Sequence, residues 1–194
     1  MTALVTDYLR ELHVQHPAVS DCAGDLSIVR VRSRHEKVFV RELRAEDIGY
    51  YLPLRLHKRY WHGQRRESLV PMFAGLIFVA NGADGREVAS RSRCVPSNCF
   101  VPVAQSYQPQ LRRELIQLET VLAHQPEAES FPELLPGREV EVRTNAEHWA
   151  RGLRGKIHKR ENKDVFVVLI EILGREVEVA GMPGELLEVI ERAA

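Results

Sequence analysis

The stretch Pro71-Met72-Phe73-Ala74-Gly75-Leu76-Ile77-Phe78-Val79 decides the fold of this chain. Its proline and glycine are typical of a turn, and the apolar residues that end it predict a buried strand. Upstream, residues 26–32 alternate as a strand does, and Ser33 with Glu36 forms a capping-box pattern that predicts a helix to about residue 45. This order of elements predicts helices packed against an antiparallel sheet.

A basic hairpin is predicted between those two strands. Residues 48–56 read as its first arm, His62-Gly63-Gln64 as its tip and residues 67–70 as its return. After the decisive stretch, residues 99–103 read as an edge strand. Leucines at i, i+4, i+7 and i+11 predict a helix over residues 110–123.

The C-terminal third has a different pattern. Prolines and glutamates between residues 124 and 136 are typical of a linker. Beyond it, residues 138–143 alternate with Val140 and Val142 facing inward, and residues 164–172 form a continuous β-branched run. Short strands at this spacing predict a small SH3-like barrel.

The composition is that of a folded protein with an uneven distribution of charge. The chain is 44% hydrophobic, which excludes general disorder, and its 27 basic and 27 acidic residues argue against a general nucleic-acid coat protein. Residues 26–72 nevertheless carry eleven Lys/Arg against five acids, while acids concentrate between residues 114 and 141. This asymmetry indicates either a surface that faces polyanions or a solvated face with ordinary ion pairs.

The sequence has no signature of export or of a membrane span. Its longest apolar run, residues 165–170, is too short to cross a bilayer, and its first residues lack a basic start. Three cysteines cannot all pair within one chain, and thiols are usually reduced where no export signal is present. We therefore expect a cytoplasmic protein that does not associate with a membrane.

No arrangement of residues predicts catalysis or a metal centre. Cys94 and Cys99 lie five positions apart without a second Cys/His pair, so buried structural thiols are expected. His57 and His62 could approach across the hairpin, but two imidazoles without a supporting carboxylate rarely make a metal site. The chain lacks the G-x-S-x-G, H-E-x-x-H and phosphate-binding glycine motifs, and a hydrolase would need an acidic or histidine cluster assembled in space. We expect no enzymatic activity, no metal and no cofactor, so that function comes from binding surfaces.

Five segments together resemble the NusG family of transcription factors. They are Ile28-Val29-Arg30-Val31-Arg32-Ser33-Arg34-His35-Glu36-Lys37, Tyr51-Leu52-Pro53-Leu54, the opening stretch, Gly137-Arg138-Glu139-Val140-Glu141-Val142 and Gly152-Leu153-Arg154-Gly155-Lys156-Ile157. Residues 26–123 resemble the family's N-terminal domain over its whole length, and residues 136–190 resemble its C-terminal KOW domain.

The resemblance implies an α+β fold, with an N-terminal antiparallel sheet and flanking helices linked to a small SH3-like β-barrel of the KOW type. The implied domains are an N-terminal extension with a short helix at 1–25, a NusG N-terminal-like domain at 26–123, a linker at 124–136 and a KOW domain at 137–194. We expect a monomer.

Several positions depart from the family pattern. Leu26 and Ser27 replace two aromatics, Ala74 and Leu76 replace a proline and a tyrosine, and Cys94 replaces a glycine. The first 25 residues, with amphipathic spacing over 2–12, are an addition. These departures indicate a specialised paralogue that resembles RfaH- or UpxY-type proteins.

The resemblance implies a factor that binds RNA polymerase during elongation, suppresses pausing or termination, and recruits a partner through its KOW domain. Relatives grip two helices of the polymerase clamp in an apolar depression. By resemblance, the polymerase-binding residues are Arg30, Tyr51, Leu52, Phe73 and Leu76. Composition alone would instead place Phe73 and Leu76 in the core.

The hairpin is the best candidate for contact with nucleic acid. Its cations can neutralise phosphates, and Tyr60 or Trp61 can stack on an unpaired base. Relatives place this domain beside the upstream DNA and the non-template strand, which are the expected targets. The other interpretation is an exposed solubilising hairpin. The predicted nucleic-acid-binding residues are Arg32, Arg34, His35, Lys58, Arg59, Tyr60, Trp61, Arg65 and Arg66.

Cations also gather in the KOW-like part of the sequence. Arg154, Lys156 and His158 are the predicted partner-binding residues, since relatives use this barrel to recruit a ribosomal protein or a termination factor. The alternative function is an RNA- or ribosome-binding KOW protein that does not act on polymerase. That alternative predicts that the C-terminal part alone carries the affinity.

Overall fold

The chain folds into two compact units. The computed structural model describes residues 17–62, 64–80, 82–132, 138–144, 147–160, 163–182 and 186–189. The first unit runs to residue 53 and resumes over residues 71–112, and the second holds residues 54–70 and the described residues after 112. The helix expected over residues 2–12 lies outside the described residues.

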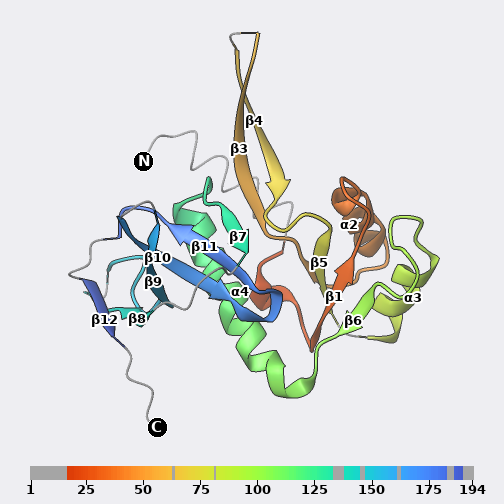
Figure 1. Cartoon of the computed structure of the whole chain (residues 1–194). Helices are drawn as coiled ribbons and strands as arrows, with labels where there is room; N and C mark the ends of the chain where they lie inside the picture. Colours follow the sequence, from red (N-terminus) through yellow and green to blue (C-terminus); the bar gives the residue numbers. More distant parts are fainter. Residues whose placement is uncertain are drawn as a thin grey trace. The chain divides into compact units, whose positions relative to one another are not determined.

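A four-stranded antiparallel sheet forms the first unit (Figure 1). Its strands lie in the order β2 (Tyr50–Tyr51), β5 (Leu76–Ala80), β1 (Leu26–Arg30) and β6 (Phe100–Pro102). The unit also contains η1 (Val19–Asp21), α2 (Glu36–Ala45), α3 (Ala83–Arg91), η2 (Gln105–Tyr107) and the start of α4 (Gln108–His124). The predicted buried strand and the predicted edge strand, β5 and β6, are both confirmed.

The start of α4 fastens the first strand of this sheet. Gln108 is buried, and its side-chain amide accepts a hydrogen bond from the Leu26 amide at 2.8 Å and donates to the Leu26 carbonyl at 2.8 Å. The same amide nitrogen donates to the Val103 carbonyl at 3.0 Å. One side chain thus satisfies three buried backbone groups that would otherwise cost free energy.

Helix α2 begins later than the capping-box pattern predicts, and that prediction is wrong. Arg34 adopts a left-handed φ of 66°, which turns the chain after Ser33. The N-cap is therefore His35, which makes no side-chain cap hydrogen bond. Glu36, expected to close the box, is buried instead and accepts a hydrogen bond from the Gly75 amide at 2.7 Å.

The predicted arm over residues 48–56 is divided into two strands. β2 ends at Tyr51, and β3 (Leu54–Trp61) begins after Pro53. Proline has no amide hydrogen to continue a ladder, while its carbonyl accepts a hydrogen bond from the Met72 amide at 2.8 Å. β3 and β4 (Gln64–Pro71) then form the long two-stranded hairpin visible in Figure 1.

The second unit also contains a six-stranded antiparallel sheet. Its order is β12 (Leu187–Val189), β8 (Arg138–Val142), β9 (Arg154–Arg160), β10 (Lys163–Ile170), β11 (Arg175–Val179) and β7 (Ser130–Pro132), with η3 (Glu171–Leu173) between β10 and β11. Val140 and Val142 are buried, as their alternation predicts. The α+β class is confirmed.

Two sequence predictions about this region remain predictions. No recorded pairing of the described residues joins the outer strands β12 and β7, so closure into an SH3-like barrel is still an expectation. β7 lies within the range predicted as a linker and pairs with β11 from Ser130↔Val177 to Pro132↔Arg175. The domain boundaries at residues 123 and 136 are likewise still expectations.

The helices of the described residues differ from membrane-spanning helices. None of those helices is both long enough and apolar enough to cross a bilayer.

Candidate functional site

A half-exposed apolar corner lies at one end of the first sheet. Arg30 and Leu76 are register partners on β1 and β5, and Ile28 pairs with Val101 on β6. Because side chains two residues apart on a strand, and those directly opposite across a ladder, share a face, all four lie on one face of the sheet. Leu76 and Ile28 are half-buried, Val101 is 47% exposed, and Arg30 is exposed.

The opposite face of the sheet is buried over β1 and β5. Val29, Ile77 and Val79 are fully buried on that face, in contrast to the corner. The corner therefore presents apolar side chains beside one cation, which is the chemistry of a protein-binding anchor. Sequence reasoning selected Arg30 and Leu76 but missed Ile28 and Val101, because only the strand register brings them together.

The other three residues predicted to bind polymerase are buried. Phe73 and Leu52 are each 2% exposed, and Tyr51 is 5% exposed. Tyr51 pairs with Phe78 across β2 and β5, and the two ring centroids lie 6.3 Å apart. The structure thus places these three side chains in the core, and their role in binding stays a prediction.

Glu36 holds the turn that precedes β5. Its carboxylate accepts the Gly75 amide hydrogen bond, and the Gly75 carbonyl accepts a hydrogen bond from the Val31 amide at 2.9 Å. Gly75 has a φ of +74°, and a Cβ there would lie 3.0 Å from the Val31 carbonyl oxygen. The turn, and with it the start of β5 at Leu76, is fixed by contacts from α2 and from the residue that follows β1.

Replacing Glu36 with alanine is expected to lower the free energy of unfolding by about 1–3 kcal/mol, because the partly buried Gly75 amide loses its acceptor. Glu36→Gln keeps an acceptor oxygen and should lose less than about 1 kcal/mol. Urea denaturation of both variants measures the difference. Equal losses would contradict this account, because glutamine keeps both an acceptor oxygen and the side-chain volume.

The hairpin presents exposed cations and aromatics near its tip. Tyr60 is 74% exposed and Trp61 is 49% exposed, and as neighbours on β3 they point to opposite faces of the ribbon. The Arg59 guanidinium carbon lies 5.1 Å from the Trp61 ring centroid, and the His62 ring meets Trp61 edge-on at 5.0 Å. One face of the tip is thus an arginine–tryptophan pair, an arrangement suited to an unpaired base with its phosphate.

The cations of the hairpin differ in their partners. Arg55 forms an ion pair with Glu129 at 3.1 Å, and Lys58 forms one with Glu127. Arg65 pairs with Glu67, two residues away on β4. For Arg59 and Arg66 no carboxylate partner is recorded within the described part of the chain. These two arginines are the tip cations most available to phosphate.

The remaining predicted nucleic-acid-binding residues, Arg32, Arg34 and His35, lie between β1 and α2. All three are exposed, and the His35 Nδ1 lies 3.0 Å from the Ser33 carbonyl oxygen. They belong to the first unit, whereas the hairpin belongs to the second. Their binding role remains a prediction.

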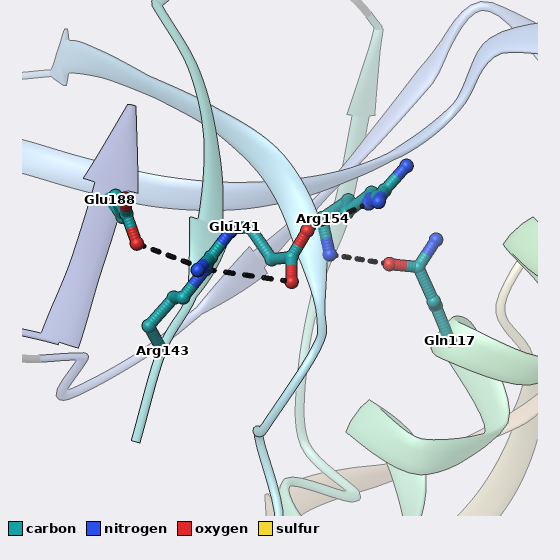
Figure 2. A network of polar contacts seen from close by, with 5 residues as sticks. All are labelled: Gln117, Glu141, Arg143, Arg154 and Glu188. Atoms are coloured by element: carbon teal, nitrogen blue, oxygen red, sulfur yellow. Dashed lines mark hydrogen bonds and ion pairs between the residues drawn. The ribbon is translucent and has the colours of Figure 1, made fainter. Parts of the chain in front are cut away.

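The predicted partner-binding cations on β9 face acids on β8. Arg154 pairs in register with Glu141, and Lys156 with Glu139. Figure 2 shows that Glu141 lies between Arg143 and Arg154, with its carboxylate 3.0 Å from Arg154 Nε. The backbone amide of Arg154 donates to the Gln117 side chain at 2.6 Å. The backbone of His158 is part of β9, but the structure does not describe its side chain.

Two surface hollows are lined by residues that do not form a recognisable catalytic site. The larger, about 410 Å³, lies in the first unit beside Arg44 and Tyr50, whose hydroxyl accepts a hydrogen bond from Arg44 Nε at 2.7 Å. Burial raises the pKa of the Tyr50 phenol, and Arg44 opposes that shift. The smaller, about 330 Å³, is lined by Glu127, Glu129 and Glu178, among others.

The described residues do not form a candidate metal site. Among them, no group of three His, Cys, Asp or Glu side chains is placed to hold an ion. Cys94 is buried, as expected, whereas Cys99 is only partly buried.

Comparison with known proteins relates the first unit and the hairpin to one family. Residues 27–114 match the family model of NusG, described as transcription termination factor nusG. No curated protein matches the chain significantly.

Solved structures with similarity over most of the chain have low identity. NusG of Thermotoga maritima, in a structure concerned with domain interaction, is 17% identical over 86% of this chain and 97% of its own, with a TM-score of 0.45. In conformation B of the MjSpt4:Spt5 complex, the matched chain is 14% identical over 87% of this chain and 99% of its own, with a TM-score of 0.24. In conformation A, the identity is 15% over 87% of this chain and 99% of that chain, with a TM-score of 0.23. The family match over residues 27–114 is therefore the comparison that bears on function.

Proposed function

We propose that this protein is a NusG-family transcription elongation factor that binds the clamp of RNA polymerase through its first unit. By holding the clamp in one state, it suppresses pausing or termination, and it recruits a second partner through its C-terminal sheet. It acts by binding that shifts a conformational equilibrium, without covalent chemistry. The observation that carries the proposal is the family match over residues 27–114, which includes the apolar corner and the hairpin.

The apolar corner supports polymerase binding as its site. Ile28, Leu76 and Val101 leave apolar surface exposed at the edge of an otherwise buried sheet, next to Arg30. A few anchors of this kind carry most of the binding energy of an ordinary protein–protein interface. Phe73 is buried and therefore unsuitable as a surface probe, since a charge there would unfold the unit.

The double variant Arg30→Glu/Val101→Asp is expected to weaken binding to core RNA polymerase roughly 30-fold or more, the size of effect typical of hot-spot residues. Both side chains are exposed, so thermal unfolding should stay close to wild type. The matched control is Arg113→Glu/Ile116→Asp on α4, because Arg113 is exposed and Ile116 is 47% exposed.

The affinity of each variant is measured by its binding to core polymerase immobilised on a surface. Loss in the corner variant with binding retained in the control supports the proposal. Equal binding by the wild type and both variants would rule out the corner as the docking site, and no binding by the folded wild type would rule out the function.

The hairpin supports a second contact, with nucleic acid. On the tip, Arg59 and Arg66 supply positive charge, and Trp61 and Tyr60 supply exposed rings. Single-stranded DNA near the polymerase is the proposed ligand, since bases with free faces are what such rings bind.

The alternative, an RNA- or ribosome-binding KOW protein that does not act on polymerase, has less support. It relies on the cations of β9, but Arg154 and Lys156 stand opposite Glu141 and Glu139. Acids directly across the ladder reduce the field that a phosphate would meet. We therefore propose that the C-terminal sheet binds a protein, either a ribosomal protein or a termination factor.

A further inference from the structure

The stem of the hairpin is held by the segment that follows α4, here called the connector (residues 125–132). The Leu56 amide on β3 donates a hydrogen bond to the Pro126 carbonyl at 2.6 Å. On either side of that bond, Arg55 pairs with Glu129 at 3.1 Å and Lys58 pairs with Glu127. All of these contacts lie within the second unit.

The connector is itself fixed to the C-terminal sheet. The Gln125 side chain donates to the Ala180 carbonyl and accepts from the Ala180 amide, each at 2.8 Å. The Glu178 amide donates to the Glu129 carbonyl at 3.2 Å, and β7 continues the attachment by pairing with β11. With its backbone held on both sides, the connector keeps the two carboxylates in place beside the stem cations.

The ion pairs divide the hairpin into a masked stem and an open tip. Arg55 and Lys58 point their charges at connector carboxylates, whereas Arg59 and Arg66 have no recorded carboxylate partner in the described part of the chain. A carboxylate and a phosphate offer the same anionic oxygens to guanidinium and ammonium groups. A phosphate that reaches the stem must therefore displace a carboxylate that is already there.

We propose that Glu127 and Glu129 act as a built-in competitor for nucleic-acid phosphates, which confines binding to the tip of the hairpin and weakens it. The inference rests on the proposed function of the hairpin as a contact for single-stranded DNA. The stem ion pairs are partly exposed, so the competition is modest and adjustable. Neutralising the connector, by substitution or by a basic partner that takes over its carboxylates, extends the binding surface from the tip into the stem.

The test is the affinity of the full chain for a fluorescein-labelled forked DNA with one duplex and one single-stranded arm. The variant Glu127→Gln/Glu129→Gln should bind about 2- to 30-fold tighter than wild type, the range that two exposed ion pairs allow. Its salt slope between about 50 and about 200 mM should steepen by up to two, because two more cations meet phosphates. The matched control is Glu87→Gln/Glu188→Gln, which removes the same charge from two exposed ion pairs that involve no residue of the stem.

A double-mutant comparison separates masking from a general change in charge. Lys58→Gln should change the affinity of the wild-type chain by less than about twofold, because its charge is already neutralised. In the Glu127→Gln/Glu129→Gln background the same change should weaken binding more than in the wild type. A thermal melt of each variant checks that the hairpin and connector stay folded.

The outcomes distinguish the inference from the function on which it rests. If the tip variant Arg59→Gln/Trp61→Ala/Arg66→Gln loses affinity but Glu127→Gln/Glu129→Gln binds no tighter than its control, masking is overturned and hairpin binding stands. If the tip variant binds as wild type does, or wild type does not bind at low salt, the hairpin function fails and the inference with it. Tighter binding, a steeper salt slope and a larger effect of Lys58→Gln together support it.

Discussion

Alanine in place of Gly155 is expected to unfold the C-terminal sheet, with a loss of at least about 4 kcal/mol in the free energy of unfolding. A Cβ at this position would lie 2.0 Å from the Val167 carbonyl oxygen and 2.8 Å from the Phe166 ring. Both obstacles belong to β10, which pairs with β9 directly beside Gly155. Backbone atoms of a central strand cannot move aside without breaking the ladder, so the added methyl group separates the two strands.

Hydrogen–deuterium exchange measures the unfolding of the C-terminal sheet strand by strand. Amides of β9, β10 and β11 should lose protection in Gly155→Ala. Gly82→Ala is the matched control, because its φ of −148° suits any residue and nothing lies within 4 Å of its Cβ. It should cost less than about 1 kcal/mol. Wild-type protection in the Gly155 variant would mean that the two strands pair less closely than the structure has them.

Removing the charges and the ring from the hairpin tip should lower the affinity for forked DNA about 100-fold or more. In Arg59→Gln/Trp61→Ala/Arg66→Gln, the loss combines a stacking contribution of about 1–3 kcal/mol with two phosphate contacts. The salt slope of the remaining affinity should fall by about two. Stability should change little, because all three side chains are exposed.

Fluorescence anisotropy at two salt concentrations checks both numbers. The control Arg93→Gln/Tyr107→Ala/Arg113→Gln removes the same charge and one exposed ring, since Tyr107 is 56% exposed. It should reduce binding only slightly. A control variant that loses as much affinity as the tip variant would show that net charge, and not the tip, controls binding.

Local sequence patterns predicted most elements of the fold. The apolar run after Gly75 is β5, the alternation from residue 138 is β8, and the leucine spacing after residue 110 lies within α4. These signals are local, because the period of apolar residues directly reflects a strand or a helix with one buried face. The capping-box prediction at Ser33 failed because Arg34 takes a left-handed conformation, which the pattern does not encode.

The residues of the candidate sites could be predicted only in part from local sequence patterns. Tyr60 and Trp61 were selected from their place beside a turn, and both are exposed. Phe73 was selected by resemblance, whereas composition alone placed it in the core, where its side chain is 2% exposed. Val101 was missed, because its place at the corner depends on pairing with Ile28, more than seventy residues earlier.

By itself, the sequence determined the order of most strands and helices and the basic hairpin. The tertiary structure alone decided which predicted residues stay accessible. Strand register placed Arg30 and Leu76 in one apolar corner, and the connector placed Glu127 and Glu129 against Lys58 and Arg55. The physical reason is that periodicity is set by near neighbours along the chain, whereas burial and ion pairing depend on segments that meet only after the chain has folded.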